Sequence, residues 1–168
     1  MSIAQEVKSE TEDIQSGKYL EFLIDNGSYG IEIRYVTEII SMQPVNTLPD
    51  TPAYIKGVIN LRGRIIPVID MHLRLNKKDV VYSDRTCIVV IENQRLCAGL
   101  IVDRVSDVLR IDEKDIAPAP DLNVSGSQQY LSGIGKVNDG VKLLLNCDKL
   151  FDYSEVNAIN DITGGIEA

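Results

Sequence analysis

The sequence of 168 residues lacks tryptophan and has only two phenylalanines and a single histidine, His72. A core built from this chain must therefore be aliphatic, and the abundance of Val, Ile and Leu in the middle of the chain favours β-strands. A site that needs an imidazole base could use only His72, and no nucleophile motif lies beside it. We interpret His72 as a packing or surface residue. No apolar run approaches the roughly 18 residues of a membrane-spanning helix, so direct membrane insertion is not expected.

The chain also lacks an excess of positive charge. Its 17 Lys and Arg residues face 25 Asp and Glu residues, which gives a net charge of −8. An acidic chain is a poor match for nucleic acid or for an anionic membrane surface. The acidic, polar segment 1–17 does not resemble a signal peptide, so a cytoplasmic location is expected. Segment 1–17 is predicted to be a flexible N-terminal tail, and 153–168 an acidic C-terminal tail.

Cysteine is scarce and widely spaced, with Cys87, Cys97 and Cys147 each inside an apolar run. The sequence has no C-x-x-C motif and no Cys/His cluster, so neither a metal site nor a cofactor is predicted. We expect three buried thiols in a reducing compartment.

An internal repeat is the main positive feature. The segment YIKGVINLRGRIIPVID from Tyr54 aligns without gaps with YLSGIGKVNDGVKLLLN from Tyr130, at an offset of 76 residues. Upstream, GIEIRYVTEI from Gly30 matches GLIVDRVSDV from Gly99 at an offset of 69 residues. The second copy is therefore longer in the middle, near 112–129. Short strands, hairpins and a few short helices, present twice, predict two small packed β-barrels.

Comparison of the two copies distinguishes residues that the fold requires, which occur in both, from residues that occur in one copy only. The hairpin of the second copy turns on Asn138 and Asp139, whereas the first copy has Arg62 and Arg64 around Gly63. Turn geometry requires no cation at these positions. The two arginines are either presented to a partner, paired within the chain with a carboxylate such as Glu38, or simply solvated.

The motif V-[TS]-[ED]-[IV] recurs at Val36–Ile39 and Val105–Val108. Its presence in both copies favours a structural role, with the acid near the start of a short helical turn. No phosphate-binding loop or complete dinucleotide motif is present, and no pattern of carboxylates indicates catalysis. The chain is therefore predicted to be a binding module and not an enzyme.

These segments carry a family resemblance. The runs GVINLRGRIIPVID, YGIEIRYVTEI, GLIVDRVSDVL and YLSGIGKV resemble the CheW chemotaxis adaptors over about residues 18–152. The resemblance implies two five-stranded SH3-like β-barrels packed as a pseudo-repeat. We place the first barrel at about 18–82 and the second at about 83–152.

The resemblance also implies partners. CheW adaptors couple the cytoplasmic tip of chemoreceptors to the regulatory domain of the histidine kinase CheA in membrane-associated arrays. The positions carried over to the receptor groove are Val36, Glu38, Ile39, Gly57, Asn60, Leu61 and Arg62. Those carried over to the kinase contacts are Val45, Thr47, Leu48, Lys56 and Leu122.

Two other functions stay open from the sequence. One is a CheV-like or kinase-derived regulatory fragment, and the other is a small enzyme on a double β-barrel. For the adaptor we expect a monomer in isolation.

Overall fold

The computed structural model describes residues 16–150, except 76, 79, 80, 95, 120–129 and 139. The fold is mainly β, as predicted, with short helical turns between the strands. Its strands are β1 Lys18–Ile24, β2 Gly27–Glu32, β3 Val36–Ser41, β4 Ile55–Leu61, β5 Arg64–Asp70, β6 Cys87–Glu92, β7 Cys97–Val102, β8 Arg104–Arg110, β9 Ile116–Pro118, β10 Leu131–Val137 and β11 Gly140–Leu145. The helical elements are η1 Ile33–Tyr35, α2 Met71–Arg74, η2 Glu113–Asp115 and η4 Cys147–Lys149.

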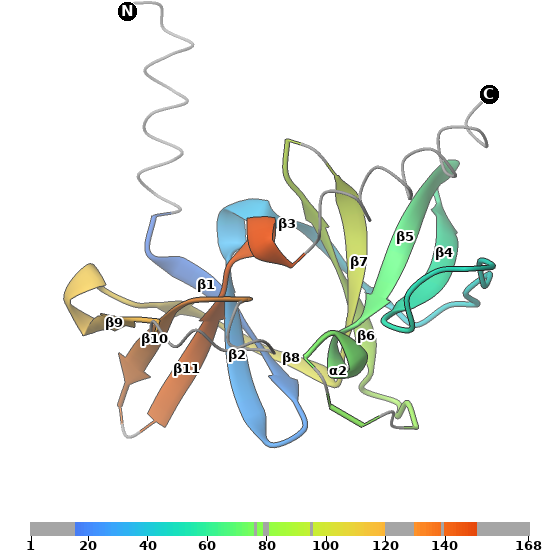
Figure 1. The fold of residues 1–168 in the computed structure, drawn as a ribbon. Helices are drawn as coiled ribbons and strands as arrows, with labels where there is room; N and C mark the ends of the chain where they lie inside the picture. The colour runs from blue at the N-terminus through green and yellow to red at the C-terminus, as the bar shows by residue number, and fades with distance from the viewer. Residues whose placement is uncertain are drawn as a thin grey trace, which may run out of the picture.

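The strands form two sheets. The six-stranded sheet has the order β8-β1-β2-β11-β10-β9, and the five-stranded sheet has the order β3-β6-β7-β5-β4. In Figure 1 the blue strands β1 and β2 accordingly lie beside the orange strands β10 and β11. Each sheet contains one parallel pair, β11 with β2 and β5 with β7.

The barrel boundaries predicted from the repeat, 18–82 and 83–152, do not follow the sheets. The five-stranded sheet is built from the continuous segment 36–102, and the six-stranded sheet takes β1 and β2 from before it and β8 to β11 from after it. Each sheet thus combines the first hairpin of one repeat with the later strands of the other. The equivalent strands of the two copies are alike in sequence, so the alignment alone cannot tell which copy supplies the hairpin.

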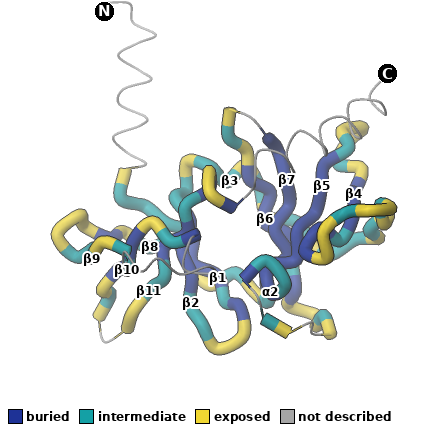
Figure 2. The backbone as a smooth tube through the Cα atoms, viewed as in Figure 1, coloured by how far each residue is buried: buried dark blue, intermediate teal, exposed yellow. Residues whose placement is uncertain are grey.

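The hairpin of β6 and β7, which the second copy contributes to the five-stranded sheet, is buried on both faces. Every residue of β7 is buried. Ile88, Val90 and Ile101 belong to a cluster inside the five-stranded sheet's own barrel, whereas Val89 and Leu100 join a larger cluster shared with Phe22 and other residues of the six-stranded sheet. Figure 2 shows β5, β6 and β7 buried along most of their length. The shared cluster is the apolar centre that holds the two barrels together.

The recurring V-[TS]-[ED]-[IV] motif lies in strands and not in helical turns. The helical turn is limited to η1, and Val36–Ile39 continues as β3, while the second copy of the motif lies in β8. Apolar spacing over so few residues fits either a helical turn or a strand, and pairing of β3 with β6 decides the outcome.

Gly57 and Gly133 are aligned glycines with the same structural role. A Cβ atom on Gly57, whose φ is +150°, would lie 2.0 Å from the carbonyl oxygen of Asn46, which pairs with Val58 in an isolated bridge. A Cβ atom on Gly133 would lie 2.8 Å from Cγ2 of Ile116 in β9. Both glycines therefore let a neighbouring segment approach the backbone at a bulge.

We predict that Gly57→Ala lowers the free energy of unfolding by about 2–3 kcal/mol, because the added methyl group collides with backbone and the φ angle disfavours a side chain. Gly63→Ala is the matched control, since Gly63 has a φ of +87° and nothing within 4 Å of its Cβ position. The control is expected to cost about 1 kcal/mol. Urea denaturation measures both values, and equal losses would contradict the steric explanation.

Candidate functional site: the β3–β4 edge

The positions carried over to a receptor lie on the two outer strands of the five-stranded sheet, β3 and β4, and in the turn that follows β4. Arg62, in the turn after β4, reaches Glu38 of β3 with two hydrogen bonds of 3.1 and 2.9 Å between guanidinium nitrogens and carboxylate oxygens. This bidentate pair joins the two edges of the sheet and so closes the barrel at this end. The Arg62 side chain is 75% exposed, so the pair alone contributes little stability, about 0.2–1 kcal/mol.

The backbone at Arg62 is unusual for an arginine. Arg62 has a φ of +53° and Gly63 a φ of +87°, so both central residues of this two-residue turn are in the left-handed region. The aligned residue of the second copy is Asn138, with a φ of +51°. Asparagine is favoured there, whereas an arginine costs about 1–2 kcal/mol. The turn would therefore form at least as well without the guanidinium, so the geometry of the turn does not explain the presence of an arginine.

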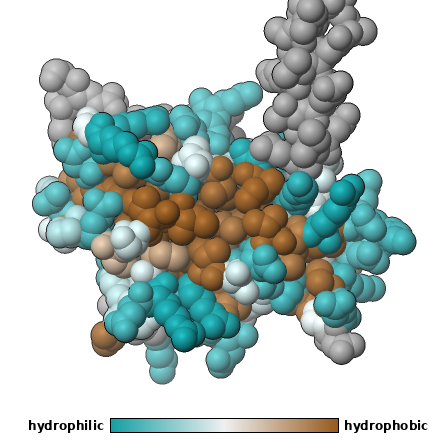
Figure 3. Space-filling model, turned by 180° about the vertical axis from the view of Figure 1, so that it is seen from behind, coloured by the Kyte–Doolittle hydropathy of each residue, from teal (hydrophilic) through white to brown (hydrophobic). Residues whose placement is uncertain are grey.

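The other positions carried over to a receptor lie on the same two strands, with Val36 packed partly against the shared cluster and Leu61 partly against the core of the five-stranded sheet. Ile39 is 46% exposed, and Val36 and Leu61 are half-buried. Asn60 is exposed, but its Oδ1 accepts a hydrogen bond of 2.7 Å from the backbone N–H of Gly63, which ties Asn60 to the turn. A band of hydrophobic surface crosses the face of the molecule opposite to that of Figure 1 (Figure 3). We name the strip of Val36, Glu38, Ile39, Leu61 and Arg62 the β3–β4 edge.

Arg64, the second additional cation, is directed elsewhere. Its guanidinium lies 3.5 Å from the carboxylate of Glu92 at the end of β6, and both side chains are about half exposed. This long contact reaches β6, which is separated from β5 by β7 in the sheet. Arg64 is a suitable comparison for Arg62, because it carries the same charge on the same hairpin.

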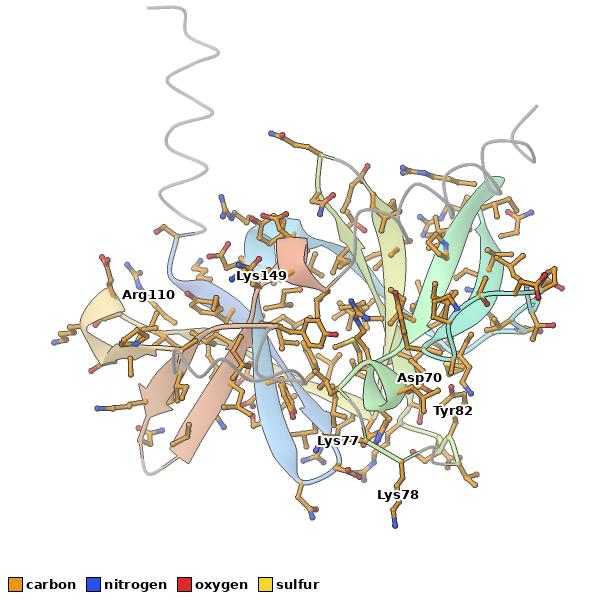
Figure 4. All side chains as sticks on the ribbon, viewed as in Figure 1. Asp70, Lys77, Lys78, Tyr82, Arg110 and Lys149 are labelled. Atoms are coloured by element: carbon orange, nitrogen blue, oxygen red, sulfur yellow. The ribbon has the colours of Figure 1, made fainter. Side chains whose placement is uncertain are left out.

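Four of the positions carried over to the kinase lie beside the Asn46 bridge. Thr47 is exposed, Val45 and Leu48 are half-buried, and Val45 packs against the core of the five-stranded sheet. Lys56 lies 3.8 Å from the buried carboxylate of Asp70 and over the ring of Tyr82. Figure 4 shows Asp70 and Tyr82 close to each other beside α2. Leu122 lies outside the described residues.

The described thiols show no sign of activation. The three cysteines are free; Cys97 and Cys147 are buried, as expected, whereas Cys87 is half-buried, and burial raises the pKa of each. The pKa of Cys147 rises to about 12, mainly because of burial and secondarily because of the charge of Asp148. A thiol that stays protonated is a poor nucleophile and a poor metal ligand.

One cluster of titratable side chains was not predicted from the sequence. His72 is buried, and its Nε2 lies 2.6 Å from a carboxylate oxygen of Asp103, while Asp25 approaches from the β1–β2 turn. The three residues are distant in sequence, and the aligned position of His72 in the second copy is Asp148, so no sequence signal could have indicated the cluster.

Comparison with known proteins decides the family. The CheW-like domain family matches residues 18–155. The chain belongs to the CheW-like family. It is 37% identical to the chemotaxis protein CheW of Bacillus subtilis over 153 residues, which cover 90% of the chain and 98% of that protein. It is 34% identical to the chemotaxis protein CheW of Klebsiella aerogenes, with 86% and 87% of the two chains covered.

A solved structure supports the same conclusion. The crystal structure of the scaffolding protein TtCheW from Thermoanaerobacter tengcongensis superposes with a TM-score of 0.76 at 34% identity, over 83% of this chain and 94% of that one. The CheW-like fold and the role of a chemotaxis coupling adaptor follow for this chain. Within its described residues, no helix is both long and apolar enough to cross a bilayer.

We predict that Arg62→Asn changes the free energy of unfolding by less than about 1 kcal/mol, because the lost ion pair is offset by relief of the left-handed backbone. Arg62→Val removes the same charge but places a β-branched residue at φ +53°, so it is expected to cost about 2 kcal/mol. Denaturant titration compares the two variants. A large loss for Arg62→Asn would show that the ion pair itself holds the barrel.

We also predict that Cys147 makes stability fall at high pH. The folded-state pKa is about 12 against an unfolded value near 9. The contribution is therefore complete below pH 9 and is lost as the pH rises toward 12. Urea unfolding at pH 8 and pH 10.5 should show a smaller decrease for Cys147→Ala than for the unaltered chain, and equal decreases would contradict this assignment.

Proposed function

We propose that this chain is a non-catalytic scaffold in the cytosol that binds a chemoreceptor tip and the regulatory domain of the kinase CheA at the same time. The β3–β4 edge would bind the receptor, and the surface of Val45, Thr47 and Leu48 would bind the kinase. Family membership over nearly the whole described chain supports the general role. The observation that carries the residue assignment is Arg62, a cation kept in a turn that disfavours it.

The β3–β4 edge has the composition of a surface for a helical hairpin. Ile39, Val36 and Leu61 offer apolar contact area, and the Arg62–Glu38 pair offers one charge of each sign at a fixed place. Apolar anchors supply most of the binding energy in helix recognition, and charges set the register. An ion pair made between two outer strands can open and exchange partners without disturbing the buried core.

Gly57 and Lys56 contribute to the proposed binding surfaces by contacts within the chain. The space that a side chain on Gly57 would occupy is filled by Asn46 and Thr47, so Gly57 positions the loop proposed for the kinase instead of touching a receptor. Lys56 similarly holds Asp70 and Tyr82. We therefore expect substitutions of Gly57 to weaken binding of the proposed kinase partner, through the fold of that loop.

Arg62→Asn is predicted to weaken binding of a receptor-tip peptide bundle by about tenfold or more, which corresponds to about 1.4 kcal/mol. Binding of the isolated CheA regulatory domain should be unchanged, because the kinase surface lies beyond the Asn46 bridge. Isothermal titration calorimetry with each partner measures both affinities. Arg64→Asn is the matched control and should leave receptor affinity within about twofold.

A charge exchange separates the two roles of Arg62. The double variant Glu38→Arg, Arg62→Glu can reform an ion pair across the barrel with its polarity reversed. If the receptor contacts these charges directly, the receptor affinity of the double variant stays as low as that of Arg62→Asn. Restored affinity would mean that Arg62 only closes the barrel, and no binding of either partner at micromolar concentration would contradict the adaptor function of this chain.

A further inference from the structure

Asp25, His72 and Asp103 form a side-chain cluster away from both proposed surfaces, and its central residue, His72, has a buried ring nitrogen without a hydrogen-bond partner among the described residues. His72 in α2 is 1% exposed, and its Nε2 lies 2.6 Å from Oδ1 of Asp103, between β7 and β8. This short contact makes Nε2 the hydrogen-bond donor to the carboxylate in the neutral ring. The other nitrogen, Nδ1, then presents a lone pair, and it has no hydrogen-bond partner among the described residues. A buried polar atom without a partner is rare in folded proteins.

Nδ1 faces a second carboxylate. Oδ1 of Asp25, in the turn between β1 and β2, lies 4.0 Å from Nδ1, and no described side chain bridges them. The Asp25 backbone N–H donates to Oδ2 of Asp103 at 2.7 Å, which holds the turn against the β7–β8 junction. Two electron-pair donors thus face each other across a gap that suits a cation and not a direct hydrogen bond.

The neighbouring charges leave this gap open. Oδ2 of Asp25 lies 3.9 Å from Nζ of Lys77, so the lysine approaches the oxygen that does not face His72. Figure 4 shows Lys77 between α2 and the tip of the β1–β2 hairpin. Asp70 accepts hydrogen bonds from the backbone of α2 and from Tyr82, so its oxygens are already occupied.

The repeat provides a comparison for this corner. Asp103 aligns with Arg34, and His72 aligns with Asp148. At the equivalent corner of the six-stranded sheet a fixed cation is present: the hydrogen bond to Glu32 is the main cause that raises the pKa of Arg34, and the charge of Asp148 adds to it. At the His72 corner two carboxylates flank an imidazole, and the cation present, Lys77, lies 3.9 Å from the oxygen of Asp25 that does not face His72.

We propose that Asp25 and His72 bind a zinc-class divalent transition-metal ion, with Asp103 orienting the His72 ring. A carboxylate that holds the second nitrogen of a metal-binding histidine is the usual arrangement at such sites. Ligand distances of about 2.0–2.2 Å require Asp25 Oδ1 to move toward Nδ1 by roughly half an ångström, and Asp25 lies in an exposed turn where that motion is possible. Water from the exposed side of Asp25 completes the coordination.

The ion would connect the two barrels. Asp25 belongs to the six-stranded sheet, His72 follows β5 of the five-stranded sheet, and Asp103 lies where the chain passes from one sheet to the other. A bound ion would therefore fix the relative position of the barrels. This inference does not depend on the identity of the adaptor's partners.

The single histidine makes a direct test possible. The full chain, freed of metal with EDTA, is titrated with ZnCl2 at pH 7.5 while the ring signals of His72 are followed by two-dimensional ¹H–¹³C NMR. We expect the ring signals to move and saturate at one equivalent of zinc, and the thermal midpoint to rise. His72→Gln and Asp25→Asn should each lower zinc affinity at least tenfold in calorimetry.

Controls separate this site from other binding. Cys87→Ala should keep the affinity, and Asp112→Asn, an exposed carboxylate elsewhere, should also keep it. Asp103→Asn should weaken zinc about 10- to 100-fold while leaving one ion per chain. The proposal is overturned if the His72 ring signals do not respond to zinc, if His72→Gln binds zinc normally, or if binding is lost only with Cys87.

Discussion

The structure depends on strands that are buried on both faces. The hairpin of β6 and β7 fills the five-stranded barrel with Ile88, Val90 and Ile101, and with its opposite face it packs Val89 and Leu100 against the other sheet. Burial of a large aliphatic side chain contributes about 1.5–3 kcal/mol, so neither face can be left in water without a large loss. The two barrels are therefore one cooperative unit, and the absence of tryptophan is compensated by many branched aliphatic contacts.

The buried centre of the five-stranded sheet leaves its two outer strands free to carry exposed side chains. The shared apolar cluster fixes β6 and β7, while β3 and β4 at the two margins of the same sheet keep exposed side chains and a solvent-exposed ion pair. Arg62 illustrates the division of roles, since it occupies a backbone conformation that the second copy gives to Asn138. Gly57 and Gly133 show the opposite case, in which both copies retain a residue because the neighbouring segment leaves no space for a side chain.

The sequence was sufficient for the hairpin strands, the two barrels and the family, because alternation, turn residues and the repeat are local or ungapped signals, whereas β3 and β8 were expected as helical turns. The pairing of Arg62 with Glu38 could be named as one alternative, but the left-handed φ that makes the arginine costly could not. The exchange of hairpins was missed because β1 and β6 are equivalent strands and either could complete either sheet. The surroundings of His72 were missed because Asp25 and Asp103 reach it only through that exchange.

The exchange of hairpins also limits how the two barrels can move. Within the described residues the chain passes between the sheets twice, through η1 after Glu32 and through Asp103 before Arg104. Glu32 pairs with Tyr19, and Arg104 pairs with Leu23, so the two connections lie near opposite ends of β1. A rotation about the line through these two connections displaces them least, and that line runs roughly along β1. A rigid-body change that keeps both connections intact is therefore easiest as a rotation about this line.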